Sequence, residues 1–385
     1  HYTSIENIHK VIDPLFLDDL KKELAGIENI SVIKTRVQKL HDFQDKLSSL
    51  KFLDPACGSG NFLTETYLSL RRLENQVLGD LNLADKSRGT MFFSFVNPIK
   101  VSISQFYGIE INDFAVTVAK TALWIAESQT MNETENIVSM HIDFLPLKTN
   151  AYIHEGNALR LDWEQIVPKN ELNYIMGNPP FVGKKYQSKN QKADMKYIFG
   201  EKTKGVGNLD YVTAWYKKAA DYMQTTSITA AFVSTNSIVQ GEHLPLFWKQ
   251  LYENYTINII FAYQTFKWES EASEKAAVHC VIIGFTLGHV WGKRKIFISD
   301  SIVHEANNIH PYLIDLPNIF IENRSKPLFE SQPLVYGSFA LDDGNYTISE
   351  SEYKDILAKE PNTKKFLKKF IGSEEFINGK KRYCV

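Results

Sequence analysis

Two short stretches decide the fold: Lys51-Phe-Leu-Asp-Pro-Ala-Cys-Gly-Ser-Gly-Asn-Phe62 and, downstream, Asn173-Tyr-Ile-Met-Gly-Asn-Pro-Pro-Phe181. Each begins with a short apolar run, which predicts a buried strand, and ends in residues that favour a turn. The glycines of the first turn let the backbone approach a ligand, and a helical pattern follows directly. The second stretch ends in an amide, a rigid diproline and an aromatic ring, a combination suited to gripping a flat amine.

Each stretch also has an ordinary structural interpretation. A glycine pair is common in strand-to-helix turns, and Asn-Pro-Pro is a common loop sequence. Their joint occurrence, each at the end of an apolar run, favours a shared function.

Short apolar runs alternate with helical patterns up to residue 287, which predicts an α/β fold with a mostly parallel sheet. The last two strands predict an antiparallel hairpin around a polar segment, residues 268–275. From about Gly288 the alternation ends, which predicts a linker and the start of another domain. The expected strands are 52–53, 105–109, 151–154, 174–176, 228–233, 256–262 and 278–285. The expected helices are 5–24, 31–48, 61–78, 112–127, 208–224 and 243–253.

Composition narrows the class of protein. The 385 residues are 44% hydrophobic, which is typical of a packed globular chain. No uninterrupted apolar run approaches 18 residues and no signal peptide is visible, so we expect no membrane partner. Three widely spaced cysteines predict a reducing, cytoplasmic environment without disulfides, and ten histidines without a ligand-spaced cluster predict no metal site.

The two stretches resemble those of amino-group DNA methyltransferases that use S-adenosylmethionine, especially the large N6-adenine enzymes of bacterial restriction-modification and related defence systems. The likeness runs from Tyr2 to about Phe285, and the order of its motifs is similar to the gamma arrangement. It implies a Rossmann-like methyltransferase sheet ending in an antiparallel hairpin. The expected domains are an N-terminal helical segment with a cofactor motif (1–50), a catalytic domain (51–287), and a linker with the start of a target-recognition region (288–385).

The resemblance implies a set of cofactor-binding residues. Asp54 would meet the ammonium group of S-adenosylmethionine, and Glu110 would bind the ribose hydroxyls, although a helix-capping role is the alternative for Glu110. Asn157 stands where many relatives have Asp and would accept a hydrogen bond from the cofactor's adenine amine. Leu63 replaces the third glycine of a dinucleotide fingerprint, which disfavours NAD. The full set is Tyr2, Thr3, Asp54, Ala56, Gly58, Gly60, Asn61, Phe62, Glu110, Ile111, Asn157, Ala158 and Asn178.

The predicted catalytic residues are Asn178, Pro179, Pro180 and Phe181. The side-chain oxygen of Asn178 and the carbonyl of Pro179 would accept hydrogen bonds from an exocyclic amine and make its nitrogen more nucleophilic. Methyl transfer then depends mainly on positioning. The base must leave the duplex, and Phe181 is the expected stacking surface. The predicted substrate-binding residues are Phe181, Lys184, Lys185, Phe266 and Trp268, with core packing as the alternative for Phe266.

Charge distribution informs the choice of partner more than the net charge of −2 does. Residues 184–204 form a lysine-rich stretch directly after the catalytic motif. We expect a loop there that contacts phosphates and becomes ordered on DNA. A second basic cluster, residues 364–382, is equally well explained as a solvated surface.

Other functions stay open at this point. The chemistry also suits N4 of cytosine, an RNA adenine or a protein glutamine, and a noncatalytic DNA-specificity subunit is a different class. No nuclease motif is visible. Because the chain starts at His1 inside a cofactor motif and stops at Val385, we expect the remaining domains of a larger polypeptide as partners, besides double-stranded DNA. The isolated chain should then bind the cofactor but methylate DNA weakly.

Overall fold

A computed structural model of the chain describes residues 3–86, 98–138, 150–241, 243–268, 278–290, 292–321, 329–331 and 344–385. It divides into two compact units, His1–Asn323 and Arg324–Val385.

The first unit is built on a nine-stranded sheet with the order β3-β2-β1-β4-β5-β7-β6-β8-β9. Neighbouring strands from β3 to β5 are parallel, while β7 is antiparallel to both β5 and β6. All seven predicted strands and the antiparallel hairpin are therefore confirmed. The strands are β1 (Phe52–Asp54), β2 (Phe106–Glu110), β3 (Tyr152–Glu155), β4 (Tyr174–Gly177), β5 (Thr229–Thr235), β6 (Asn258–Trp268), β7 (Val278–Thr286), β8 (Arg294–Ser299) and β9 (Ile302–Ala306), with the small pair β10 (Ile309–His310) and β11 (Ile314–Asp315) following.

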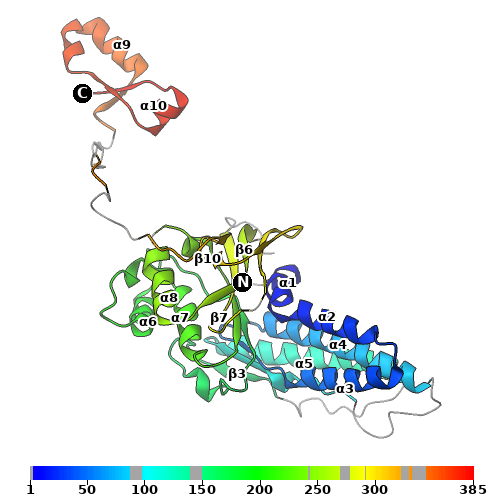
Figure 1. The fold of residues 1–385 in the computed structure, drawn as a ribbon. Coiled ribbons are helices and arrows are strands. Elements are labelled where there is room, and N and C mark those ends of the chain that lie inside the picture. Colours follow the sequence, from blue (N-terminus) through cyan, green and yellow to red (C-terminus); the bar gives the residue numbers. More distant parts are fainter. Residues whose placement is uncertain are drawn as a thin grey trace. The chain divides into compact units, whose positions relative to one another are not determined.

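Helices cover both faces of this sheet (Figure 1). One face carries α1 (Ile5–Ile12), α2 (Asp18–Glu28), α3 (Ile33–Ser49), α4 (Asn61–Lys86) and α5 (Asp113–Val138), with a π-helical turn at Asp13–Leu17 between α1 and α2. The other face carries α6 (Lys189–Phe199), α7 (Thr213–Tyr222) and α8 (Lys249–Asn254).

Successive strand residues feed the two hydrophobic cores on opposite faces of the sheet. In β1, Phe52 packs into the core under α1–α5 and Leu53 into the core under α6–α8. In β4, Met176 packs into the core under α1–α5 and Ile175 into the core under α6–α8. This alternation is the side-chain period of a strand, and it explains why strands buried on both faces read as continuous apolar runs.

Two predictions about local structure were wrong. The sheet does not end at β7, because β8 pairs in parallel with β6 and β9 pairs with β8, within the segment predicted as a linker. The sequence pattern does not reveal β9, because it is an edge strand in which the apolar Ile302 and Val303 are exposed together with His304 and Glu305. The lysine-rich stretch is not an uninterrupted loop, because it contains α6, which starts at a capping box formed by Ser188 and Gln191.

The second unit contains a small antiparallel sheet and two helices. The strands pair in the order β12 (Thr347–Ser349), β14 (Arg382–Cys384) and β13 (Lys368–Phe370), and the helices are α9 (Glu350–Lys359) and α10 (Ser373–Asn378). Part of the C-terminal basic cluster is ion-paired within this unit. Lys380 contacts Glu374 at 2.8 Å, and Arg382 contacts Glu375 at 2.5 Å.

An interhelical histidine gives the first unit a pH-dependent contact. His9 on α1 lies 2.9 Å from an oxygen of Asp13 and 3.2 Å from an oxygen of Glu65 on α4. Hydrogen bonds to these two carboxylates raise the pKa of His9 to about 9. Because the pKa is raised on folding, the stabilisation is complete below pH 6.5 and is lost as the pH rises through 9.

We therefore expect His9→Gln to lower the free energy of unfolding more at pH 6 than at pH 10. Partial solvent exposure of the histidine limits the difference to about 1 kcal/mol. Chemical denaturation of both proteins at the two pH values measures it. Equal losses at both pH values would show that the imidazole contributes by packing and not by charge.

Candidate active site

The predicted site residues converge where the order of the parallel strands reverses. β1 lies between β2 and β4, so the chain crosses to one side after β1 and to the other side after β3. In open parallel sheets this switch point is where ligands bind, beyond the carboxyl ends of the strands. Asp54 ends β1, Glu110 ends β2, and Asn178 directly follows β4.

The glycine turn, residues 55–60, connects β1 to α4. Gly58 and Gly60 have φ angles of 55° and 82°, a conformation that disfavours side chains. A Cβ at Gly60 would lie 2.9 Å from the Cβ of Ala119 on α5, whereas a Cβ at Gly58 would meet open space. Gly60 is thus required for packing, and Gly58 leaves the backbone bare on the open side of the turn.

Asp54 is a buried carboxylate at the base of this turn, with 1% of its surface exposed. It accepts a 3.0 Å hydrogen bond from the backbone N–H of Ala56. Burial raises its pKa to about 8, and the nearby charge of Glu110 adds to the rise. A Cβ at Gly177 would clash with the nearer carboxylate oxygen, so only glycine fits beside Asp54 at the end of β4.

Asn178 follows Gly177 and has an unusual environment. Its side-chain nitrogen lies 3.5 Å from the hydroxyl of Thr3, a long hydrogen bond. Its side-chain oxygen is buried and has no hydrogen-bond partner within the described part of the chain. Leaving such an oxygen unsatisfied costs about 1–3 kcal/mol, so this acceptor is poised for a donor that the chain does not supply.

Glu110 joins the glycine turn to the start of α5. Its two carboxylate oxygens accept 2.9 Å hydrogen bonds from the N–H groups of Gly58 and Asn112. Its neighbour Ile111 is 69% exposed. The side chain of Asn112 caps α5, since it accepts a 3.0 Å hydrogen bond from the N–H of Ala115. The half-buried carboxylate of Glu110 instead faces the glycine turn and the residue before the helix.

Asn157 lies in the loop after β3, which we call the cofactor loop (residues 156–161) after the role that the sequence predicts for Asn157 and Ala158. Its side-chain oxygen accepts a 2.9 Å hydrogen bond from the N–H of Leu159, and its nitrogen donates to Asp194 at 3.0 Å. Both ends of the amide are therefore oriented. Ala158 beside it is buried in the core under α6–α8.

The remaining predicted residues differ in accessibility. Phe181 is half-buried and contacts both hydrophobic cores, and Phe266 on β6 packs against the core under α1–α5. Phe62 is buried in that same core. Ala56 in the glycine turn and Asn61 directly after it are half-buried. Tyr2 and the side chain of Trp268 lie outside the described residues. Lys184 and Lys185 are exposed, and Lys184 donates to Asn208 at 3.3 Å.

Two buried carboxylates near the predicted catalytic motif are not among the predicted site residues. Asp194 on α6 binds the cofactor loop, and Asp210 accepts hydrogen bonds from the N–H groups of Val182 and Val212 at 3.0 and 3.1 Å. Asp194 could have been found, because Gln191, Asp194, Met195, Ile198 and Phe199 follow the spacing of one helical face. An acid on the apolar face of a lysine-rich helix indicates a buried partner.

The described residues contain neither a metal-binding cluster nor a membrane-spanning helix. No group of three or more His, Cys, Asp or Glu side chains there has an arrangement that could hold a metal ion. Nor does any helix in those ranges have the length and apolarity to cross a bilayer.

The sheet order, the antiparallel β6–β7 hairpin and the placement of the motifs define a Rossmann-like fold of the S-adenosylmethionine-dependent methyltransferase class. The chain belongs to the MmeI DNA-methyltransferase domain family, which it matches over residues 30–298. Residues 315–385 match the MmeI target recognition domain.

Two relatives extend over the whole chain. DNA methyltransferase A of Bacillus subtilis (strain 168) is 42% identical over 388 aligned residues, which cover 100% of this chain and 42% of the relative. The structure of the Type IIL restriction-modification enzyme MmeI in complex with DNA matches 100% of this chain and 50% of its own, with a TM-score of 0.86 and 40% identity. The chain thus spans half or less of the length of each relative.

Proposed function

We propose that this protein transfers a methyl group from S-adenosylmethionine to the exocyclic N6 amine of an adenine flipped out of duplex DNA, within a restriction-modification or phage-defence enzyme. The observation that carries the proposal is the buried, unpartnered side-chain oxygen of Asn178 at the switch point of the sheet. Family membership supports the same chemistry.

The residues at the switch point fit S-adenosylmethionine. The buried carboxylate of Asp54 suits a cationic ammonium group, because a cation would offset the burial that raises its pKa. The bare backbone at Gly58 forms a cradle that a side chain would fill. Glu110 would bind the ribose hydroxyls, and the oriented oxygen of Asn157 would accept from the adenine amine. When bound, the cofactor supplies an electrophilic methyl group on a sulfonium.

The chain itself would activate the target amine by hydrogen bonding. The Asn178 oxygen and the Pro179 carbonyl accept the two amine hydrogens, which draws the nitrogen toward a pyramidal, more nucleophilic form. Pro179 has no N–H group, so it cannot compete as a donor, and its ring fixes the backbone. The hydroxyl of Thr3 lies 3.5 Å from the nitrogen of the Asn178 amide, which leaves the amide oxygen for the amine. The proton leaves after methyl transfer, so no general base has to act first.

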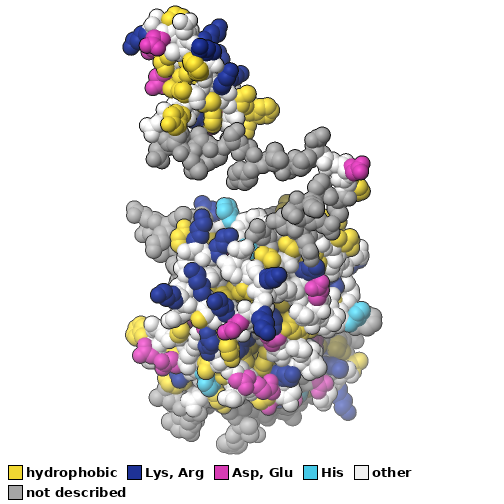
Figure 2. Space-filling model, turned by 90° about the vertical axis from the view of Figure 1, so that its left-hand side faces the viewer, with side chains coloured by type: hydrophobic (Ala, Val, Ile, Leu, Met, Phe, Trp, Pro, Cys, Tyr) yellow, Lys and Arg dark blue, Asp and Glu magenta, His cyan; other side chains and the backbone are white. Residues whose placement is uncertain are grey.

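Aromatic rings and lysines would hold the DNA around the flipped base. Phe181 stacks on the base, and Phe266 forms a second wall. Figure 2 shows the face of the first unit on which α6 lies, where Lys and Arg side chains gather. The exposed lysines after the catalytic motif are Lys184, Lys185, Lys189, Lys192, Lys196, Lys202 and Lys204.

Product analysis tests the proposal directly. The purified protein is incubated with duplex DNA and S-adenosylmethionine, and the DNA is digested to nucleosides for mass spectrometry. N6-methyladenine is expected, and modification-sensitive sequencing then gives the recognition site. N4-methylcytosine instead would refute adenine specificity, and methylated protein or RNA without modified DNA would refute the substrate class.

Replacing Lys184, Lys185 and Lys189 by Glu should weaken DNA binding at every sequence, because exposed lysines contact phosphates. Each lost phosphate contact reduces the slope of log affinity against log salt concentration by roughly one. Fluorescence anisotropy over a series of salt concentrations measures the slope. The matched control replaces Lys22, Lys34 and Lys39, three exposed lysines of α2 and α3 on the other face of the sheet. An unchanged slope in the first variant would assign these lysines to a solvated surface.

A further inference from the structure

We propose that Asp194 is a positioning residue that couples the cofactor loop to the basic helix α6, so that a filled cofactor site raises the affinity for DNA. The inference rests on the proposed function and adds a form of regulation to it.

Asp194 is a buried carboxylate, 5% exposed, at which three donors from two other segments converge. One oxygen accepts from the side chain of Asn157 at 3.0 Å and from the hydroxyl of Tyr211 at 2.8 Å. The other accepts from the Nε of Arg160 at 2.6 Å. Asn157 and Arg160 belong to the cofactor loop, Tyr211 precedes α7, and Asp194 itself belongs to α6.

These hydrogen bonds make the loop and the helix move together. Hydrogen bonds to an ionised, buried carboxylate are stronger than those between neutral groups, and losing one leaves a buried donor unpaired. The Arg160 guanidinium also stacks over the ring of Tyr197 on α6, with 4.3 Å between the guanidinium carbon and the ring centroid. The cofactor loop is therefore tied to α6 by a polar contact and by a stacking contact.

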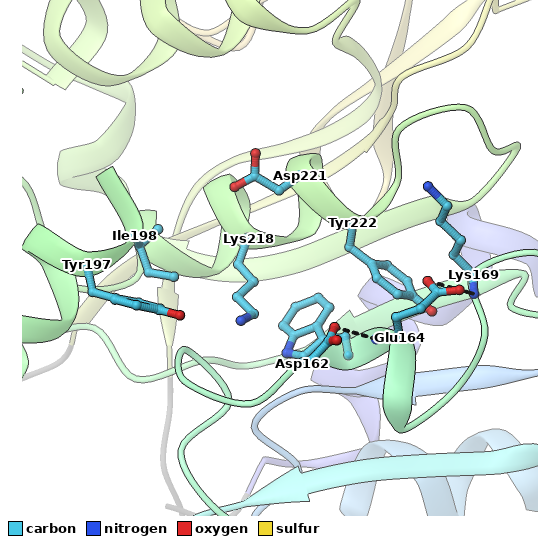
Figure 3. Close-up of a pocket in the computed structure, with 9 residues that line it drawn as sticks. Asp162, Glu164, Lys169, Tyr197, Ile198, Lys218, Asp221 and Tyr222 are labelled. Carbon is cyan, nitrogen blue, oxygen red and sulfur yellow. Dashed lines mark hydrogen bonds between the residues drawn. The ribbon is translucent and has the colours of Figure 1, made fainter. Parts of the chain in front are cut away.

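Helix α7 holds the same loop from a second side. Lys218 donates to the carbonyl oxygens of Leu159 and Leu161 at 3.3 and 2.6 Å. Figure 3 shows Lys218 on α7 above Asp162, beside a surface cavity of about 430 Å³ that Tyr197 and Tyr222 also line. Lys218 therefore ties the loop carbonyls to α7, while Asn157 and Arg160 tie the same loop to Asp194 on α6.

Helix α6 carries the charge that would contact DNA. Lys189, Lys192 and Lys196 are exposed on it, whereas Met195 and Phe199 are buried in the core. A cofactor that orders the cofactor loop also orders this helix. DNA then binds without losing the conformational entropy of the helix again. Such coupling is reciprocal and typically corresponds to a change in affinity of about 5- to 150-fold.

The test measures the affinity for a fluorescein-labelled duplex with and without saturating S-adenosylhomocysteine. In the native protein the cofactor product should raise DNA affinity by about fivefold or more. In Asp194→Asn the ratio should fall below about twofold, because the new amide N–H faces the donor groups of Asn157 and Tyr211. DNA affinity without cofactor should change little. The matched control, Asp162→Asn, replaces an exposed carboxylate next to the same loop and should keep the native ratio.

The outcomes separate this inference from the proposed function. A purely structural role for Asp194 would lower thermal stability or both affinities and leave their ratio unchanged, which would overturn the inference. A native ratio of one would overturn it too. If the native protein bound neither S-adenosylhomocysteine nor DNA, the proposed function would fail first. Should Asp194→Asn not fold, Tyr211→Phe removes one of the three donors and should give an intermediate ratio.

Discussion

Asn178→Ala should reduce the rate of methyl transfer by about 10²–10³-fold or more, the effect of removing one preorganised hydrogen-bonding group from a reacting centre. The affinity for S-adenosylmethionine should stay within about threefold of the native value, since the loss concerns an interaction made in the transition state. Incorporation of labelled methyl groups into DNA measures the rate, and calorimetry measures cofactor binding.

Stability provides the control for this variant. The Asn178 oxygen is buried without a partner in the described structure, so removing it relieves an unfavourable burial. We expect the unfolding temperature of Asn178→Ala to be no lower than that of the native protein. Thr3→Ala, which removes the long hydrogen bond to the amide, should lose less activity. Equal losses of transfer and cofactor affinity would assign Asn178 to cofactor binding alone.

The sequence was sufficient for the elements whose residues carry a local pattern. Strands β1 and β4 are apolar runs buried on both faces, and the antiparallel pair β6–β7 encloses a polar segment. The glycine turn could be predicted because glycine has no side chain to clash with a bound ligand or a packed helix. These features depend on residues close together in the chain.

Features that depend on tertiary packing could not be predicted in this way. Asn157 and Asp194 are 37 positions apart, and their contact exists because α6 packs beside the cofactor loop. The orphan oxygen of Asn178 is a property of burial, not of the Asn-Pro-Pro motif. Strand β9 lies at an edge, where four of its five residues are exposed and apolar and polar side chains do not alternate.

Asp54→Asn should weaken cofactor binding but increase the stability of the protein without cofactor. Loss of the charge should weaken S-adenosylmethionine binding by about 10- to 150-fold, the value of a charge-assisted hydrogen bond of about 1.5–3 kcal/mol. The same change should stabilise the protein without cofactor. The native carboxyl has a pKa of about 8, against 3.8 for an ordinary aspartate, so it disfavours the folded state wherever it must ionise.

The sign of the pH dependence follows from proton counts. Between pH 3.8 and 8 the folded protein holds a proton on Asp54 that the unfolded chain has released, so native stability falls as the pH rises through this range. The amide introduced by Asp54→Asn does not titrate. The stability difference should therefore grow in favour of the variant from pH 5 to pH 8, by about 1 kcal/mol for each pH unit. Thermal unfolding at several pH values measures it, with Asp162→Asn as an exposed control.

Binding of the cofactor should reverse the protonation of Asp54. If the ammonium group pairs with the carboxylate, binding at pH 7 should release about one proton in the native protein and none in Asp54→Asn. Calorimetry in two buffers of different ionisation enthalpy counts these protons. Proton release that persists in the variant would place the titrating group elsewhere. If Asp54→Asn loses both the proton release and the tight binding, the carboxylate that is buried at a cost in stability is the group that binds the cofactor.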